Sequence, residues 1–184
     1  DVGMLEASPA GNLPAVFDER NLSFAEATVN ALTELGVMPL LRNPTGRIQR
    51  IHVSRAGDFG RIQLDAAAHG REEFGRVVVA RDFGDALENR LLQLGSLTRY
   101  RPARFVGVDP MLDGSVPNGS VPNGCRAVRI ADENGEATLH ARLLVAADGA
   151  RSTVRAALGI DASEHDYGQT LFVTRLRSQR PPDG

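Results

Sequence analysis

The strongest candidates for a ligand site lie in residues 143–155, which read Leu-Leu-Val-Ala-Ala-Asp-Gly-Ala-Arg-Ser-Thr-Val-Arg. An apolar run ends at Asp148 and Gly149, and Ser152 follows where the first turn of a helix is expected. This order places a carboxylate at the carboxyl end of a strand, where open α/β sheets bind ligands. Gly149 would let the backbone approach a ligand closely. The alternative is a tight strand-to-helix turn in which Asp148 or Ser152 only caps the helix.

Two charged residues near the start of the chain are further candidates. Glu6 follows the apolar residues 2–5, and the second strand of a Rossmann-type domain ends in an acidic residue that accepts hydrogen bonds from a ribose. A solvated charge at a strand end is the commoner case. Arg20 closes the run Asp18-Glu19-Arg20, and a guanidinium can hold a phosphate through two parallel hydrogen bonds. A plain surface arginine is the alternative there.

Other kinds of catalytic chemistry find no support in the sequence. The histidines are scattered without metal-ligand spacing: His52, His69, His140 and His165. Cys125 is the single cysteine, so a disulfide within the chain and a thiolate metal site are both excluded. We therefore expect no metal site, and we identify no catalytic nucleophile or base.

The composition narrows the partners and the compartment. The net charge of −2 comes without a dense Lys/Arg run, so no nucleic-acid partner is expected. The longest apolar runs, such as residues 143–147, are far shorter than the ~20 residues of a membrane span. No secretory signal is present, which favours a cytoplasmic location. The chain opens on Asp1 and stops in Arg-Pro-Pro-Asp-Gly, which we interpret as truncation of a longer protein.

Two helices are expected to carry the apolar faces. Ser23 and Glu26 form the pattern of a capping box. Apolar residues then recur at helical spacing and Gly36 ends the helix; they are Ala25, Val29, Leu32 and Leu35. A second helix is expected to be capped by Asp82 and closed by Gly95. Its buried face is predicted to comprise Leu87, Leu91 and Leu94.

Strands are expected between and after these helices, beyond a loop over residues 7–22. Residues 47–55 and 61–66 form a predicted hairpin that turns at Gly57 and Asp58. A Ser-Val-Pro-Asn-Gly unit occurs twice over residues 115–124, which we interpret as a duplicated surface turn. A third, short helix is predicted to end near Gly159. The remaining predicted strands are residues 2–5, 77–80, 105–108, 127–130, 137–143, 143–147 and 169–177.

Three motifs, taken together, resemble one family. Ala-Asp-Gly-Ala-Arg-Ser-Thr-Val-Arg is similar to the D-G-x-x-S-x-V-R motif of the FAD-dependent aromatic hydroxylases. Phe17-Asp18-Glu19-Arg20 and the following Leu32, Leu35 and Gly36 resemble the D-x-R and L-x-x-L-G segments of that family. Met4-Leu5-Glu6-Ala7 is similar to the end of its second strand. The likeness is strongest to the hydroxylases of ubiquinone biosynthesis and covers nearly the whole chain.

The resemblance implies a fold and a division into domains. We expect an α/β chain with a partial Rossmann-like FAD-binding domain interleaved with an antiparallel β-sheet substrate region. The FAD-binding domain would take residues 1–40 and 76–160. Residues 41–75 would supply strands of the substrate domain, and residues 161–184 would start its sheet.

The resemblance also implies roles for matched residues. Glu6 would bind the ribose of FAD and Arg20 would lie against the flavin. Asp148 and Gly149 would contact FAD, in a motif that the family also links to reduced pyridine nucleotide. Ser152 and Arg155 would hold that turn in place. Two family motifs are not found in the chain: the amino-terminal glycine fingerprint and a carboxyl-terminal G-D motif at the ribityl chain.

The activity that the resemblance implies is hydroxylation of a prenylated phenol, with FAD as cofactor, NAD(P)H as reductant and O2 as oxygen donor. A lipid substrate implies a peripheral contact with the inner membrane face and contact with other proteins of ubiquinone biosynthesis. The isolated fragment is expected to be inactive. Two alternatives stay open: a catalytically inactive scaffold or assembly domain with the same fold, and another FAD oxidoreductase.

Overall fold

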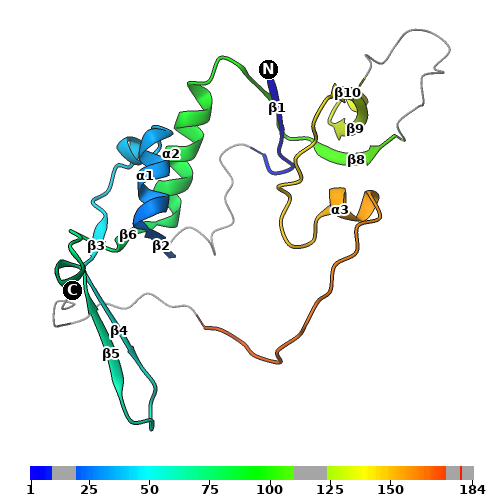
Figure 1. Cartoon of the computed structure of the whole chain (residues 1–184). Helices are drawn as coiled ribbons and strands as arrows, with labels where there is room; N and C mark the ends of the chain where they lie inside the picture. Colours follow the sequence, from blue (N-terminus) through cyan, green and yellow to red (C-terminus); the bar gives the residue numbers. More distant parts are fainter. Residues whose placement is uncertain (10–19, 110–123, 173–178, 180–184) are drawn as a thin grey trace. The chain divides into compact units, whose positions relative to one another are not determined.

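A computed structural model describes residues 1–9, 20–109, 124–172 and 179 (Figure 1). The chain divides into two compact units, each built from separate stretches of sequence. Unit 1 comprises Asp1–Asn12 and Ser96–Thr170, and unit 2 comprises Leu13–Gly95 and Leu171–Gly184. Because the two units are separate bodies, each is described by itself below.

Unit 1 contains a parallel strand pair and an antiparallel meander. Strands β1 (Val2–Leu5) and β7 (Leu97–Tyr100) pair in parallel, with Val2 opposite Leu97 and Leu5 opposite Tyr100. Strands β8 (Arg104–Val108), β9 (Arg126–Asp132) and β10 (Gly135–Ala141) form a three-stranded antiparallel sheet in the order β10-β9-β8. Parallel and antiparallel pairing therefore coexist in one unit.

The core of unit 1 lies along the central strand β9. Val128 and Ile130 point to the same face of that strand, since side chains two residues apart share a face. Both are buried, as are Ala103 before β8 and Val154 in the short helix α3 (Thr153–Ala157). Helix α3 lies in contact with β8. The meander thus supports the helix that follows the Asp148 turn.

Unit 2 contains two helices and a three-stranded antiparallel sheet. Strands β2 (Asn21–Ala25) and β3 (Gly46–Ile48) flank the central strand β6 (Gly75–Val79). Helix α1 (Glu26–Glu34) follows β2 directly, and helix α2 (Ala80–Leu92) follows β6. The 3₁₀ helix η2 (Met38–Leu40) lies in contact with both.

The packing of unit 2 joins the helices to the sheet. Val29 of α1, Val78 of β6 and Ala86 of α2 are buried, and Ala86 is fully enclosed. The rings of Phe24 and Phe83 meet edge to face with centroids 4.9 Å apart, a geometry that aromatic pairs favour. These contacts fix the start of α2 against β2.

A hairpin extends from the sheet of unit 2 (Figure 1). Strands β4 (Arg50–Ser54) and β5 (Arg61–Asp65) pair antiparallel, and a second 3₁₀ helix, η3 (Ala67–His69), follows. One face carries apolar residues in directly opposed pairs, and the other carries the Arg50–Asp65 ion pair. The apolar pairs are Ile51 with Leu64 and Val53 with Ile62.

Most predicted elements are present. The α/β class with antiparallel sheets is confirmed, as are the first helix with its end at Gly36, the hairpin, the meander and the short third helix. The second helix is also confirmed, but its buried side differs from the prediction. Ala86 is its enclosed apolar residue, while Leu87 and Leu91 are half-buried and Leu94 is exposed. Its cap is Gln93, so Gly95 does not close it.

The capping-box prediction at Ser23 is wrong. Ser23 lies in β2 opposite Val77, and the residue that caps α1 is Ala25, without a side-chain hydrogen bond. The N–H of Glu26 donates instead to the carbonyl of Phe74 at 2.9 Å. Pairing with β6 therefore satisfies the start of the helix, and the local cap is not needed. For the same reason the predicted loop over residues 7–22 ends earlier, because β2 begins at Asn21.

The predicted buried strand over residues 143–147 is also wrong. These residues form no strand, and Leu143 and Val145 are 78% and 72% exposed. A strand needs a neighbour that accepts and donates its backbone hydrogen bonds, and no described strand pairs with this segment. β1 is a strand as predicted, and its first residue, Val2, is 61% exposed.

Smaller differences concern strand boundaries. Residues 47–55 divide at Gln49 into β3 and β4, which belong to different sheets. Strand β7 was not predicted, since its sequence Leu-Thr-Arg-Tyr carries little apolar periodicity. Residues 169–172 form no strand, and the rest of the predicted strand, residues 173–177, lies outside the described residues, as does nearly all of the Ser-Val-Pro-Asn-Gly repeat.

Candidate functional site

The turn between Asp148 and α3 is held by the Asp148 carboxylate. One oxygen accepts a hydrogen bond from the Ser152 hydroxyl at 2.5 Å. The other accepts from the backbone N–H of Thr153 at 2.6 Å, from its hydroxyl at 3.1 Å and from the N–H of Val154 at 3.2 Å. The first N–H groups of a helix have no partner within the helix. Asp148 therefore satisfies the donors at the start of α3.

Ser152 and Arg155 complete this turn. Ser152 is the cap residue of α3, is 8% exposed, and accepts from the N–H of Arg155 at 3.0 Å. The Arg155 guanidinium donates back to the carbonyl of Ala150 at 2.9 Å. The sequence raised a capping role for Asp148 or Ser152 as an alternative to ligand binding. The structure shows that both residues cap the helix. Their hydrogen bonds hold the turn without a ligand.

Hydrogen bonds set the charge state of Asp148. The hydroxyl of Ser152 contributes most, and with the N–H groups of Val154 and Thr153 it holds the pKa of the Asp148 carboxyl well below its usual range. Donors stabilise the ionised form of a carboxyl. A full negative charge therefore lies at the amino end of α3 at neutral pH.

Gly149 has a backbone that only glycine adopts readily. Its φ of +83° lies in the left-handed region, where a side chain is strained. A Cβ placed on Gly149 would meet nothing within 4 Å, so the space around it is open. The peptide groups beside Asp148 are thus accessible to a ligand from that side.

The depressed pKa of Asp148 gives a prediction about acid stability. An ionised Asp148 stabilises the folded chain above the pKa of the unfolded carboxyl, ~3.9, and that contribution is lost as pH falls further. Asp148→Asn should therefore melt at a lower temperature than the wild type at pH 7, with the gap closing as pH falls below about 4. Thermal unfolding followed by circular dichroism at several pH values measures this. A gap that is unchanged between pH 7 and pH 3 would contradict the assignment.

Glu6 lies immediately after β1, at the carboxyl end of the parallel pair β1–β7. Its backbone continues the ladder, since its N–H donates to Tyr100 and its carbonyl accepts from Ala103. Its side-chain Oε1 accepts from the N–H of Ser8 at 2.9 Å, while Oε2 has no hydrogen bond within the described chain. A half-buried carboxylate with one oxygen available is able to accept hydrogen bonds from a diol.

Arg20 lies immediately before β2 in unit 2. Its carbonyl accepts a hydrogen bond from the N–H of Ala80, the first residue of α2, at 2.8 Å. This bond continues the β2–β6 ladder, in which Asn21 lies opposite Val79. Asp18 and Glu19, which precede Arg20 in the predicted motif, lie outside the described residues. The backbone of Arg20 is thus fixed to the start of α2.

Three of the four predicted site residues belong to one unit. Glu6, Asp148 and Gly149 lie in unit 1 and Arg20 lies in unit 2. Within unit 1, Glu6 is held by β1 and β7, whereas the Asp148 turn is held by its own hydrogen bonds and by α3. The strand pair, the Asp148 turn and the start of β2 therefore position the candidates separately, with Asp148 and Gly149 sharing one turn.

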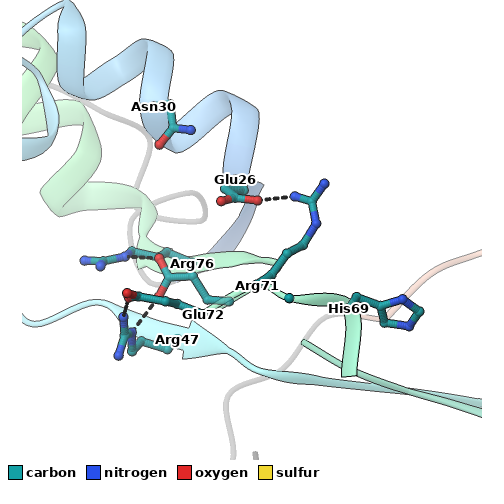
Figure 2. A pocket seen from close by; sticks show the side chains of 9 residues that line it. Glu26, Asn30, Arg47, His69, Arg71, Glu72 and Arg76 are labelled. Carbon is teal, nitrogen blue, oxygen red and sulfur yellow. Dashed lines mark hydrogen bonds and ion pairs between the residues drawn. The ribbon is translucent and has the colours of Figure 1, made fainter. Parts of the chain in front are cut away.

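Sequence reasoning missed a network of charged residues in unit 2. Arg47 donates to Glu73 at 2.6 Å and to Glu72 at 3.0 Å, and Arg76 donates to Glu73 at 2.7 Å. The hydrogen bond from Arg76, followed by that from Arg47, holds the pKa of the Glu73 carboxyl below its usual range. These residues line an open pocket of about 650 Å³. Arg71 and Glu26 also line it, and they form a further ion pair (Figure 2).

The pairing of β3 with β6 brings these charged residues together, so no local sequence pattern predicts the network. Arg47 lies opposite Arg76 on neighbouring strands, and two like charges in that position would repel. Glu73, whose side chain is only 12% exposed, accepts from both and relieves the repulsion. Every charged group in it has an opposite partner, so we assign it a structural role in holding β3 on β6.

The candidate residues fit the chemical groups of a flavin dinucleotide. A ribose presents two hydroxyl donors, and Glu6 at a strand end offers an available carboxylate oxygen. The open, positive-φ backbone at Gly149 allows a flat group to approach the peptide closely. These are properties of the residues themselves and do not depend on any bound molecule.

Comparison with known proteins identifies relatives. The FAD binding domain family matches residues 18–181. The ubiquinone hydroxylase UbiL of Rhodospirillum rubrum is 31% identical over 176 residues, which are 96% of this chain and 38% of that protein. The ubiquinone hydroxylase UbiM of Neisseria meningitidis serogroup C is 51% identical over 45 residues, covering 24% of this chain and 10% of that protein. This chain therefore spans well under half of the relatives it matches.

A solved structure shares the fold. CabE, an aromatic hydroxylase from angucycline biosynthesis, superposes with a TM-score of 0.64 at 23% identity, and the match covers 88% of this chain and 28% of that chain. At this identity the likeness concerns the fold alone.

Proposed function

We propose that the whole protein hydroxylates a prenylated phenol with NAD(P)H and O2. The chain itself belongs to the FAD-binding domain family of FAD-dependent hydroxylases. FAD is the cofactor of this family. The chain spans 38% of the UbiL sequence, so the activity of the whole protein is inferred and not read from this chain. Among the enzymes of ubiquinone biosynthesis, we propose an activity like that of 2-octaprenyl-6-methoxyphenol hydroxylase, whose motifs the sequence resembles.

The observation that carries the proposal is the turn from Asp148 to Arg155. Four residues that match the family motif are tied together in it: Asp148, Ser152, Val154 and Arg155. Motif residues that hydrogen-bond to one another support the family assignment more strongly than the same residue types without such contacts. The names of two relatives, both ubiquinone hydroxylases, support the substrate class.

In the proposed site each candidate residue has a separate task. Glu6 accepts hydrogen bonds from the ribose of FAD with the oxygen that Ser8 leaves available. Asp148 orders its turn, and Gly149 lets the backbone approach the cofactor. Arg20 lies against the flavin, with its backbone fixed by Ala80. None of these residues is assigned a proton-transfer step.

Bound FAD would supply the redox chemistry, taking electrons from NAD(P)H and activating O2 for transfer to an electron-rich ring. The chain's contribution is position and electrostatics. A phenol is already electron-rich, so the reaction needs no nucleophile from the protein. This agrees with the sequence analysis, which identifies no nucleophile.

The division into domains follows from the same proposal. Residues 1–40 and 76–160 would belong to the FAD-binding domain, and residues 41–75 and 161–184 to the substrate domain. The exposed apolar face of the β4–β5 hairpin supports this, since a sheet face of that kind is normally covered by further protein. The isolated chain is expected to lack hydroxylase activity.

Contact with the membrane is part of the proposal, because a prenylated phenol partitions into lipid. None of the described helices is long and apolar enough to cross a bilayer. Because of its lipid substrate, we propose that the protein makes peripheral contact at the inner face of the membrane from the cytoplasmic side. Contacts with other ubiquinone-biosynthesis proteins would be made there.

Isotope labelling tests the proposed reaction. The complete protein is supplied with FAD, NAD(P)H, a short-chain prenylated phenol and isotopically labelled O2. One labelled oxygen atom is expected in each hydroxylated product, and labelled water with ordinary O2 serves as the control. Consumption of NAD(P)H and O2 without a labelled aromatic product would favour the alternative of another FAD oxidoreductase. No turnover together with no flavin would favour the scaffold.

A further inference from the structure

The first turn of α2 joins two segments that are far apart in the sequence. The N–H of Ala80 donates to the carbonyl of Arg20 at 2.8 Å. Two residues later, the carboxylate of Asp82 accepts from the backbone N–H of Arg42 at 3.0 Å and of Asn43 at 2.9 Å. Residues 41–45, which we call the strap, lead from η2 to β3. Arg20 and the strap therefore lie against the same helical turn.

Asp82 is unusual for an acidic residue in the first turn of a helix, because it is only 5% exposed. The sequence predicts it as a helix cap, but this is wrong: the cap position is Val79 and no side chain caps the helix there. Its two oxygens are used for the strap instead. A buried carboxylate is costly unless hydrogen bonds satisfy it, so this contact determines where the strap lies.

The charge state of Asp82 is consistent with that role. Burial by itself would raise the pKa of the Asp82 carboxyl, but the N–H groups of Asn43 and Arg42 outweigh burial and hold the pKa below its ordinary value. The side chain is thus ionised at neutral pH. Hydrogen bonds to an ionised acceptor are roughly twice as strong as neutral ones.

The strap lines one side of a second pocket of unit 2, of about 670 Å³, with Leu41, Asn43, Pro44 and Thr45. Its far end is fixed as well, since Thr45 accepts a hydrogen bond from Arg76 at 3.2 Å. The strap is therefore attached at both ends, to Asp82 of α2 and to Arg76 of β6. Between these two anchors it has no helical or strand structure of its own.

We propose that Asp82 is a positioning residue for the flavin: it fixes the strap beside Arg20 so that both present one preformed surface to the cofactor. This rests on the proposed function, because it uses the flavin contact assigned to Arg20. Asp82 does not itself touch the cofactor in this proposal. Its effect is transmitted by the backbone of Arg42 and Asn43.

Hydrogen exchange tests the contact without any cofactor. In the complete protein without FAD, the amides of Arg42 and Asn43 are expected to exchange slowly although they lie outside regular structure. Asp82→Asn should speed their exchange about tenfold, since it removes the charge that both amides use. Asp85→Asn is the matched control, because Asp85 lies in the same helix and is exposed. Should Asp82→Asn fail to fold, Asp82→Ser and the protection of the wild-type amides decide the question.

Flavin binding tests the positioning role in the complete protein. Asp82→Asn is expected to raise the dissociation constant of FAD about tenfold, because a strap that Asp82 no longer holds must be ordered when the cofactor binds. It should also change the visible circular dichroism of bound flavin, which reports the cofactor's surroundings and which a loss of global stability alone would leave unchanged. The Asp85→Asn control should match the wild type in both measurements.

The outcomes separate this inference from the proposed function. Faster exchange at Arg42 and Asn43, together with weaker FAD binding and an altered dichroism band, supports it. Unchanged exchange overturns the contact. Faster exchange with unchanged flavin binding and dichroism overturns the positioning role while the proposed function stands. A wild-type complete protein that does not bind FAD overturns the proposed function, and the exchange result still decides whether Asp82 holds the strap.

Discussion

Gly75→Ala is expected to disrupt the sheet of unit 2. Gly75 is a buried residue of the central strand β6, opposite Ala25 of β2 and Ile48 of β3. A Cβ placed there would lie 2.0 Å from the carbonyl oxygen of Phe24. Because the obstacle is backbone in a paired strand, no side-chain rotation relieves it. We expect the free energy of unfolding to fall by about 3 kcal/mol or more, measured by chemical denaturation.

Gly46→Ala is the matched control for that substitution. Gly46 lies in β3 of the same sheet, and a Cβ there would meet only Val77 at the ordinary contact distance of 3.6 Å. We expect its effect on stability to stay below about 1 kcal/mol. Equal stability of the Gly75→Ala variant and the wild type would contradict the strand register assigned to β2 and β6.

Asp148→Ala is expected to weaken FAD retention by the complete protein about tenfold or more, or to slow flavin reduction by NAD(P)H. Four hydrogen bonds to the carboxylate are lost, and hydrogen bonds to an ionised group are stronger than neutral ones. Solvent weakens each of them here, because Asp148 is exposed. Flavin fluorescence titration and stopped-flow reduction measure the two effects.

Asp161→Ala is the control, because Asp161 is an exposed acid that follows α3 in the same unit. It should bind FAD like the wild type. Unchanged flavin content together with an unchanged reduction rate in the Asp148→Ala variant would contradict the role proposed for this turn. The stability of α3 would then be the only task of Asp148.

Local sequence patterns predicted those elements whose stabilising contacts lie between residues close in sequence. The first helix, with Val29 on its inner face and Gly36 at its end, follows from helical spacing and from the backbone freedom of glycine. The hairpin turned at Gly57 and Asp58 follows from alternation and turn chemistry. In both cases the stabilising contacts lie within a few residues of the pattern.

Patterns failed where a distant segment provides the partner. Ser23 has the spacing of a capping box, but β6 pairs with it and extends the strand. Asp82 has the position of a cap, but the strap, about 40 residues earlier, takes its carboxylate. The strand expected over residues 143–147 has no neighbour in the described chain. The spacing of residues within a segment does not show which distant segment will pair with it.

The candidate site was predicted in part for the same reason. The Asp148 turn could be identified because its donors lie within six residues of the carboxylate, as the four hydrogen bonds show. The charged network of Arg47, Glu73 and Arg76 could not, since it depends on the pairing of β3 with β6. The roles of Glu6, Arg20, Asp148 and Gly149 toward FAD stay predictions.

Titration of the complete purified protein with FAD, followed by flavin fluorescence, decides whether this protein is a flavoenzyme. We expect saturable binding of one FAD per protein with a dissociation constant of about 1 μM or below, and much weaker binding to the 184-residue chain alone. Absence of saturable binding to the complete protein at ~100 μM FAD would rule out the proposed function, and the scaffold would then be the better description of this fold.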